Sequence, residues 1–161
     1  MAARIIALCD ELVTKVVAAW PAMTNEDTAK RAYVAPVALD KATPFAGRHV
    51  WVFPGTYQDE AATRGEKNRG FAVETWVAER YPDGLAAESD AARDWFDARV
   101  EFVETLYDAL DFGQRTKTGL LSFGSRVLWT ESALAVTYDG EHLAGKKLFV
   151  ASIESTLREI A

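Results

Sequence analysis

The feature that most constrains the fold of this sequence is one long helical pattern, which runs from about Ala86 to Phe112. Apolar residues recur in it at alternating intervals of four and three, which places them along one face of a helix. They are Phe96, Val100, Val103, Tyr107 and Leu110, and the stripe is widened by Trp95, Phe102 and Leu106. At ~1.5 Å per residue such a helix is ~40 Å long, enough to lie across a whole sheet.

A shorter helical pattern and several strand patterns surround this helix. The first twenty residues carry an apolar stripe at helical spacing, which Pro21 ends. Runs typical of strands occupy residues 30–39, 48–53, 71–80, 126–131, 134–138 and 147–157. The order of elements predicts a single α+β domain over residues 1–161. Its sheet is expected to be antiparallel or mixed, with the N-terminal helix and the long helix packed on it.

Composition and charge exclude several classes of protein. The chain has 161 residues and a net charge of −6, which argues against a free-standing nucleic-acid binder. Cys9 is the one cysteine, so an internal disulfide is excluded, and its apolar helical setting is typical of a buried thiol. The apolar N-terminus is interrupted by Asp10, Glu11 and Lys15, which argues against a signal peptide. We find no apolar run long enough for a membrane span.

Motifs that could carry catalysis are incomplete. Residues 140–147, GEHLAGKK, match the start of a phosphate-binding loop, but Lys147 replaces the required Ser or Thr and a strand pattern follows. The two histidines, His49 and His142, lie in different predicted elements without a second ligand at metal-binding spacing. Ser122, Ser125 and Ser132 have no nucleophile-elbow context. We therefore expect no catalytic residue, no cofactor and no metal site.

Two polar connections are the candidate binding segments. Residues 54–70 separate two strand patterns by seventeen mostly polar residues, which is too long for a hairpin turn. We interpret about 55–70 as a flexible loop, which either contacts a partner or is a disordered surface insertion. The connection of residues 114–125 contains apolar residues that could be tucked under it or presented to a partner, and we favour the partner. The candidate interface residues are Asp59, Glu60, Arg64, Glu66, Lys67, Arg69, Leu120, Leu121 and Phe123.

Sheet edges are a second place where another chain could bind. The strand of residues 30–39 contains Pro36, which lacks a backbone N–H and is typical of an edge strand. We predict this strand and the C-terminal strand of residues 147–157 as the edges of the sheet. An exposed edge can pair with a strand of another subunit.

The layout of these elements resembles a known family. An N-terminal helix leads to a YVAPV strand, and an RHVWVFP strand is followed by a polar segment bearing Arg64 and Arg69. An FAVETWVAER strand, the long helix and a closing hairpin, LAVTYDGEHLAGKKLFVASIESTL, complete the pattern. This arrangement resembles the tail terminator, or tail completion, proteins of long-tailed bacteriophages.

The resemblance implies a structural virion protein and not an enzyme. It implies a homo-hexameric ring that caps the tail tube, ends tail elongation and joins the tail to the head connector. The partners would be the tail tube protein and a head-side connector or stopper protein. DNA would only pass through the lumen, and no membrane would be involved. The ring would be assembled in the host cytoplasm and would lie at the tail-neck junction of the virion. The alternatives are a head-tail joining or stopper protein of the neck, and a small monomeric α+β enzyme or ligand-binding domain.

Overall fold

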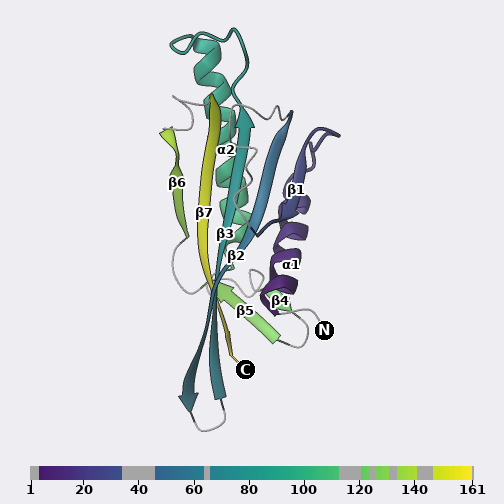
Figure 1. The fold of residues 1–161 in the computed structure, drawn as a ribbon, viewed down its shortest axis with the longest axis vertical. Helices are drawn as coiled ribbons and strands as arrows, with labels where there is room; N and C mark the ends of the chain where they lie inside the picture. Colours follow the sequence, from purple (N-terminus) through teal and green to yellow (C-terminus); the bar gives the residue numbers. More distant parts are fainter. Residues whose placement is uncertain are drawn as a thin grey trace.

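The computed structural model describes residues 4–33, 46–63, 66–112, 121–123, 126–130, 134–140 and 147–160. Within these residues the chain forms two helices and seven strands, which confirms the predicted α+β class (Figure 1). The helices are α1 (Arg4–Ala18) and α2 (Asp90–Leu110). The strands are β1 (Thr28–Arg31), β2 (Arg48–Thr63), β3 (Glu66–Arg80), β4 (Leu121–Phe123), β5 (Arg126–Thr130), β6 (Ala135–Tyr138) and β7 (Leu148–Ile160).

All seven described strands belong to one mixed sheet. Its order is β1-β2-β3-β7-β5-β4, and β6 pairs with a separate stretch of β7. The pair β1–β2 is parallel, whereas the other pairs are antiparallel. Among the described strands β1 forms one edge, so the edge prediction for residues 30–39 is confirmed only for residues 30–31. Residues 34–45, which include Pro36, lie outside the described residues.

The prediction that the C-terminal strand is an edge is wrong. β7 is a central strand, because β3 pairs with one side of it and β5 and β6 pair with the other. The physical reason is visible in its burial, since Leu148 and Val150 are buried on one face while Phe149, Ala151 and Ile153 are buried on the other. A strand with two apolar faces must be covered on both sides, which is typical of a sheet centre.

Both helices pack on one face of the sheet. Leu8, Leu12 and Val16 of α1 and Val103, Leu106 and Leu110 of α2 form one buried cluster with strand residues. Those strand residues include Val50, Val52, Val73, Val77 and Ile153. Val103 and Leu110 therefore face the side of the sheet that carries Val50 and Val52. Trp51 belongs to a second cluster on the opposite face.

The start of α2 is set by a cap. The backbone of Ser89 is extended, and its hydroxyl accepts a hydrogen bond from the N–H of Ala92 at 3.1 Å. A serine in this position satisfies one of the N–H groups that the first helical turn leaves without a partner. The helix therefore begins a turn later than the predicted Ala86, and it ends at Leu110. Residues 113–120, which follow, lie outside the described residues.

The interpretation of residues 55–70 as a loop is wrong. β2 continues to Thr63 and β3 begins at Glu66, and the two strands pair from Tyr57↔Phe71 to Thr63↔Glu66. We call residues 55–63 and 66–70 the β arm; it extends beyond the rest of the domain in Figure 1. A two-stranded ribbon satisfies its inner backbone groups whatever its side chains are, so polar residues do not prevent it from forming.

The connection of residues 114–125 is likewise not a loop throughout. Leu121–Phe123 form β4, in which Leu121 is the register partner of Leu128 and Phe123 that of Arg126. Leu120 lies outside the described residues, as does His142. Lys147 has a positive φ of 52° and β7 begins at the next residue. A strand therefore follows the GK sequence, whereas a phosphate-binding loop leads into a helix.

Candidate functional site

The root of the β arm is bent by a bulge. The pairing of β2 with β3 shifts register between Pro54 and Tyr57. Gly55 lies in this bulge, and a Cβ atom built on it would be 2.7 Å from the carbonyl oxygen of Ala72. That distance is shorter than a van der Waals contact, so the close approach of β2 to β3 requires glycine here. The Pro54-Gly55 dipeptide is thus the local sequence feature that marks the start of the arm.

The root is also connected to the helical layer by a partly buried ion pair. Glu159, near the end of β7, has a fully buried side chain, and its carboxylate pairs with the Arg4 guanidinium of α1. In register, Glu159 lies opposite Arg69 of β3 on one side and Leu128 of β5 on the other. Phe71 and Leu157, also register partners, are buried beside it. Sequence analysis missed Glu159, because its two arginine neighbours come from distant segments.

The outer part of the arm contains most of the predicted charged interface. The pairing sets Asp59 opposite Arg69, so it brings two of the six charged candidates together. The other described charged candidates each lie opposite a residue that is not a candidate, in the register pairs Glu60↔Asn68, Ala61↔Lys67 and Thr63↔Glu66. Arg64 lies outside the described residues.

Along the arm, the outer edge of β2 has no partner strand among the described residues. β1 pairs with His49 to Val52, and the N–H of Ala32 donates to the carbonyl of Val52 at 3.0 Å. In the part of the chain that the structure describes, no strand pairs with that edge of β2 beyond Phe53. An open strand edge presents unpaired N–H and C=O groups, which are a template for a strand of another chain. The arm is therefore a candidate surface for strand addition.

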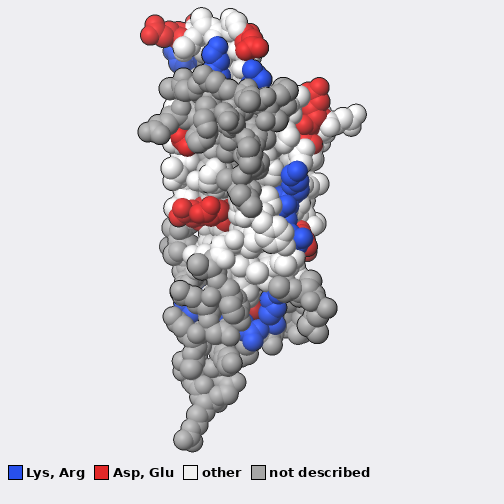
Figure 2. All heavy atoms as spheres, viewed as in Figure 1, with Lys and Arg blue, Asp and Glu red and all other residues white. Residues whose placement is uncertain are grey.

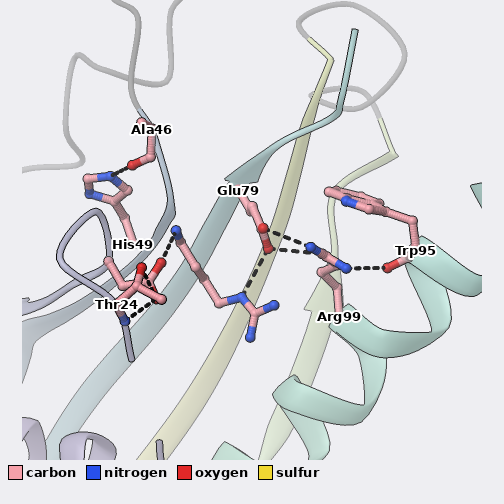
Figure 3. Close-up of polar contacts among 8 residues, drawn as sticks. Thr24, Ala46, His49, Glu79, Trp95 and Arg99 are labelled. Atoms are coloured by element: carbon pink, nitrogen blue, oxygen red, sulfur yellow. Dashed lines mark hydrogen bonds and ion pairs between the residues drawn. The ribbon is translucent and has the colours of Figure 1, made fainter. Parts of the chain in front are cut away.

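A second cluster of charged residues lies near the opposite end of the sheet (Figure 3). The Glu79 carboxylate accepts hydrogen bonds from Arg48 Nε at 3.0 Å and from Arg99 Nε and Nη2 at 2.9 and 2.8 Å. The Arg99 guanidinium also lies 4.1 Å from the Trp95 ring centroid, and that of Arg48 lies 4.1 Å from the Phe102 ring centroid. Glu79 thus joins β2, β3 and α2. The guanidinium groups of Arg48 and Arg99 are held by the Glu79 carboxylate and by aromatic rings, as is typical of a structural contact. We call these residues the clamp: Arg48, Glu79, Trp95, Arg99 and Phe102.

Asp27 extends this clamp toward the start of β2. Its carboxylate accepts hydrogen bonds from the backbone N–H groups of Arg48 and Thr24, each at 2.8 Å. Burial raises the pKa of Asp27, but these hydrogen bonds outweigh burial, so the net pKa is lowered. The carboxylate is therefore charged at neutral pH, and it connects the turn of residues 24–27, which precedes β1, to the first residue of β2.

Two residues considered for chemistry in the sequence, His49 and Cys9, make contacts that are typical of structural residues. His49 Nε2 is 2.9 Å from the carbonyl oxygen of Ala46, and its ring lies 5.4 Å from the Trp51 ring. Cys9 is buried, and burial raises the pKa of its thiol to about 11, which keeps the thiol protonated at neutral pH. Within the described residues, no group of three or more His, Cys, Asp or Glu side chains could hold a metal ion.

Comparison with known proteins gives no family assignment. No protein-family model matches the chain, and no curated protein is significantly similar to it. None of the helices in the described ranges is both long and apolar enough to cross a membrane. Function must therefore be inferred from the chain's own geometry, of which the rooted β arm with an open edge is the most distinctive part.

Proposed function

We propose that this protein is a structural assembly protein of the tail-terminator type. Its subunits would form a ring, with six as the expected number, that caps a tail tube, ends tail elongation and joins the tail to a head-side connector. The observation that carries the proposal is the β arm. It extends past its own domain, and the outer edge of β2 is unpaired there in the described residues.

An arm can join subunits in a defined orientation only if its root is held in place. Two features of the structure hold the root of the β arm. The Glu159–Arg4 ion pair connects the strand beside the arm to α1, and the buried Phe71 places the base of β3 in the core. An arm held in this way presents its edge at a defined angle, so the entropy lost on pairing with a neighbour is smaller than for a loose segment.

The distribution of charge supports a conduit for DNA at the centre of such a ring. The exposed side of α2 contains the acidic residues Asp90, Asp94, Asp97, Glu101, Glu104 and Asp108, with Arg93 as its exposed basic residue. An acidic surface repels a DNA backbone, which allows passage without binding. A lumen lined by α2 fits this charge.

The test is to shorten the arm without disturbing its root. Residues 60–68 are replaced by Asn-Gly, so that the Asp59↔Arg69 pair becomes the last before a two-residue turn, for which Asn-Gly is favoured. The variant keeps Gly55, Arg69 and Phe71. We expect it to be folded, to remain monomeric by native mass spectrometry where the unmodified protein gives a ring, and to fail to terminate tails in an assembly reaction.

A matched control changes a surface charge away from the arm. Glu104→Gln on the exposed side of α2 should assemble as the unmodified protein does. Rings of equal mass and stability from the shortened variant would show that the arm does not join subunits. An unmodified protein that stays monomeric in the presence of tail tubes would overturn the assembly proposal and favour a small monomeric α+β domain.

A further inference from the structure

The face of the sheet opposite α1 and α2 has its own buried apolar cluster and its own polar residues. Trp51, Phe53, Ala78, Leu148 and Val150 form its buried cluster, with Trp76 and Ala32 partly buried against them. None of these residues belongs to α1 or α2. Figure 2 looks onto this face, and an acidic patch lies on it among uncharged atoms, over the middle of the sheet.

Register places the polar residues of this face beside Trp76. Glu74 and Glu154 lie directly opposite each other on β3 and β7. In the next row Trp76 lies opposite Ser152, and Ser152 lies opposite Thr137 of β6. A hollow of about 330 Å³ opens there, and Trp76, Thr137, Val150 and Ser152 are among its lining residues.

The pair of glutamates is unfavourable in the isolated domain. Like charges directly opposite each other in a sheet destabilise it. Glu154 is exposed, and its two register partners are Glu74 and Ala135, so neither compensates its charge. On this face of the same two strands, the nearest described basic residues are Arg80, six residues from Glu74, and Arg158, four residues from Glu154, about 20 and 13 Å away at ~3.3 Å per residue. A cation supplied from outside the described part of the chain would remove this repulsion.

The indole of Trp76 is oriented for such a cation. Its Nε1–H donates to the Glu74 carboxylate at 3.1 Å, and the Phe53 ring packs edge-on against it at a centroid distance of 5.7 Å. These two contacts fix the ring while leaving it partly exposed. A fixed indole beside two carboxylates is a favourable environment for a guanidinium group, which can lie on the ring and hydrogen-bond the carboxylates in one plane.

We propose that Glu74, Trp76 and Glu154, with the hydroxyls of Ser152 and Thr137 at the rim, bind an arginine side chain from an extended segment of a different protein. Charge complementarity selects a basic partner, and the flat sheet face selects an extended segment. Trp and Arg are also the residues that most often dominate protein interfaces. These five residues lie outside the β arm, so shortening the arm leaves them unchanged. The arginine site can therefore be tested, and can fail, independently of the ring proposal.

The test uses nuclear magnetic resonance on ¹⁵N-labelled protein with the peptide acetyl-Thr-Val-Arg-Val-Thr-amide. The indole N–H signal of Trp76 is identified as the one missing from Trp76→Phe. We expect this signal to shift saturably with the arginine peptide. A peptide with citrulline, which has the shape of arginine without its charge, should bind at least about tenfold more weakly.

Two variants separate this site from general attraction to an acidic protein. Glu154→Gln should raise the dissociation constant about fivefold, the effect of one exposed charged hydrogen bond, whereas Asp97→Asn on the exposed side of α2 should leave it unchanged. No saturable shift by about 5 mM peptide, or equal effects of the two variants, would overturn the proposal. A shift of the Trp76 signal that depends on protein concentration without peptide would also overturn it, since the occupant would then be a second copy of this chain.

Discussion

Glu79→Gln is the most informative single change, because Glu79 is the one carboxylate between two arginines in the clamp. Its side chain and those of Arg48 and Arg99 are each 17% exposed. Glutamine keeps the shape and one acceptor oxygen but removes the charge, so Arg48 and Arg99 lose the carboxylate that lies between them. A hydrogen bond to a charged group contributes ~1.5–3 kcal/mol, and partial exposure reduces this. We expect a loss of about 2–3 kcal/mol in the free energy of unfolding, or about 5–10 °C in Tm.

The assay is urea unfolding followed by tryptophan fluorescence. A double-mutant cycle with Arg99→Gln should give a coupling energy of about 1–2 kcal/mol, because Arg99 makes two of the three hydrogen bonds to Glu79. The control is Asp90→Asn, which breaks the exposed Asp90–Arg93 pair on α2 and should change stability by less than about 0.5 kcal/mol. A loss below about 0.5 kcal/mol for Glu79→Gln would refute the clamp.

Three further predictions concern the core. Thr75 is buried at the centre of the helix-facing side of the sheet, and its hydroxyl has no hydrogen-bond partner among the described residues, so Thr75→Val should raise the free energy of unfolding by about 1 kcal/mol in urea. Val103 is fully buried between α2 and the sheet, so Val103→Asp should abolish the folded circular dichroism spectrum, and soluble folded protein would contradict this core. The pKa of Cys9 is raised to about 11, so the unfolded state releases the thiol proton first as pH rises. Stability should therefore fall between about pH 9 and 11, and Cys9→Ala should fall less over that range.

Local patterns in the sequence were sufficient for the fold class and for most elements. The apolar spacing of residues 96–110 predicted α2, and alternating or continuous apolar runs predicted β2, β3, β5, β6 and β7. These signals are local, because a helix or strand that buries one face must repeat its apolar residues at the period of its backbone. The same periodicity placed Val103 against the strand of residues 48–53, but it left open whether the contact is with Val50 and Val52 or with the face of Trp51, which the structure decides in favour of Val50 and Val52.

The arm could not be predicted in this way. Residues 56–70 show no apolar alternation, because a ribbon outside the core has no buried face to mark. Their pairing follows from the strands that lead into them, which pair as Val52↔Thr75 and Phe53↔Glu74 before the bulge and remain paired, in a shifted register, beyond it. The polar composition of these residues therefore predicts a loop, although backbone pairing alone is sufficient to form a strand.

Apolar periodicity along the chain is enough to place the two helices and the core parts of the strands, and to identify the faces that they bury. Tertiary structure decided which strands are neighbours, and so placed β7 at the centre of the sheet and Glu74 opposite Glu154. It also brought together Arg48, Glu79 and Arg99, and Arg4 and Glu159. The physical reason is that periodicity depends on a few successive residues, whereas pairing depends on the free energy of contacts between segments far apart in the chain.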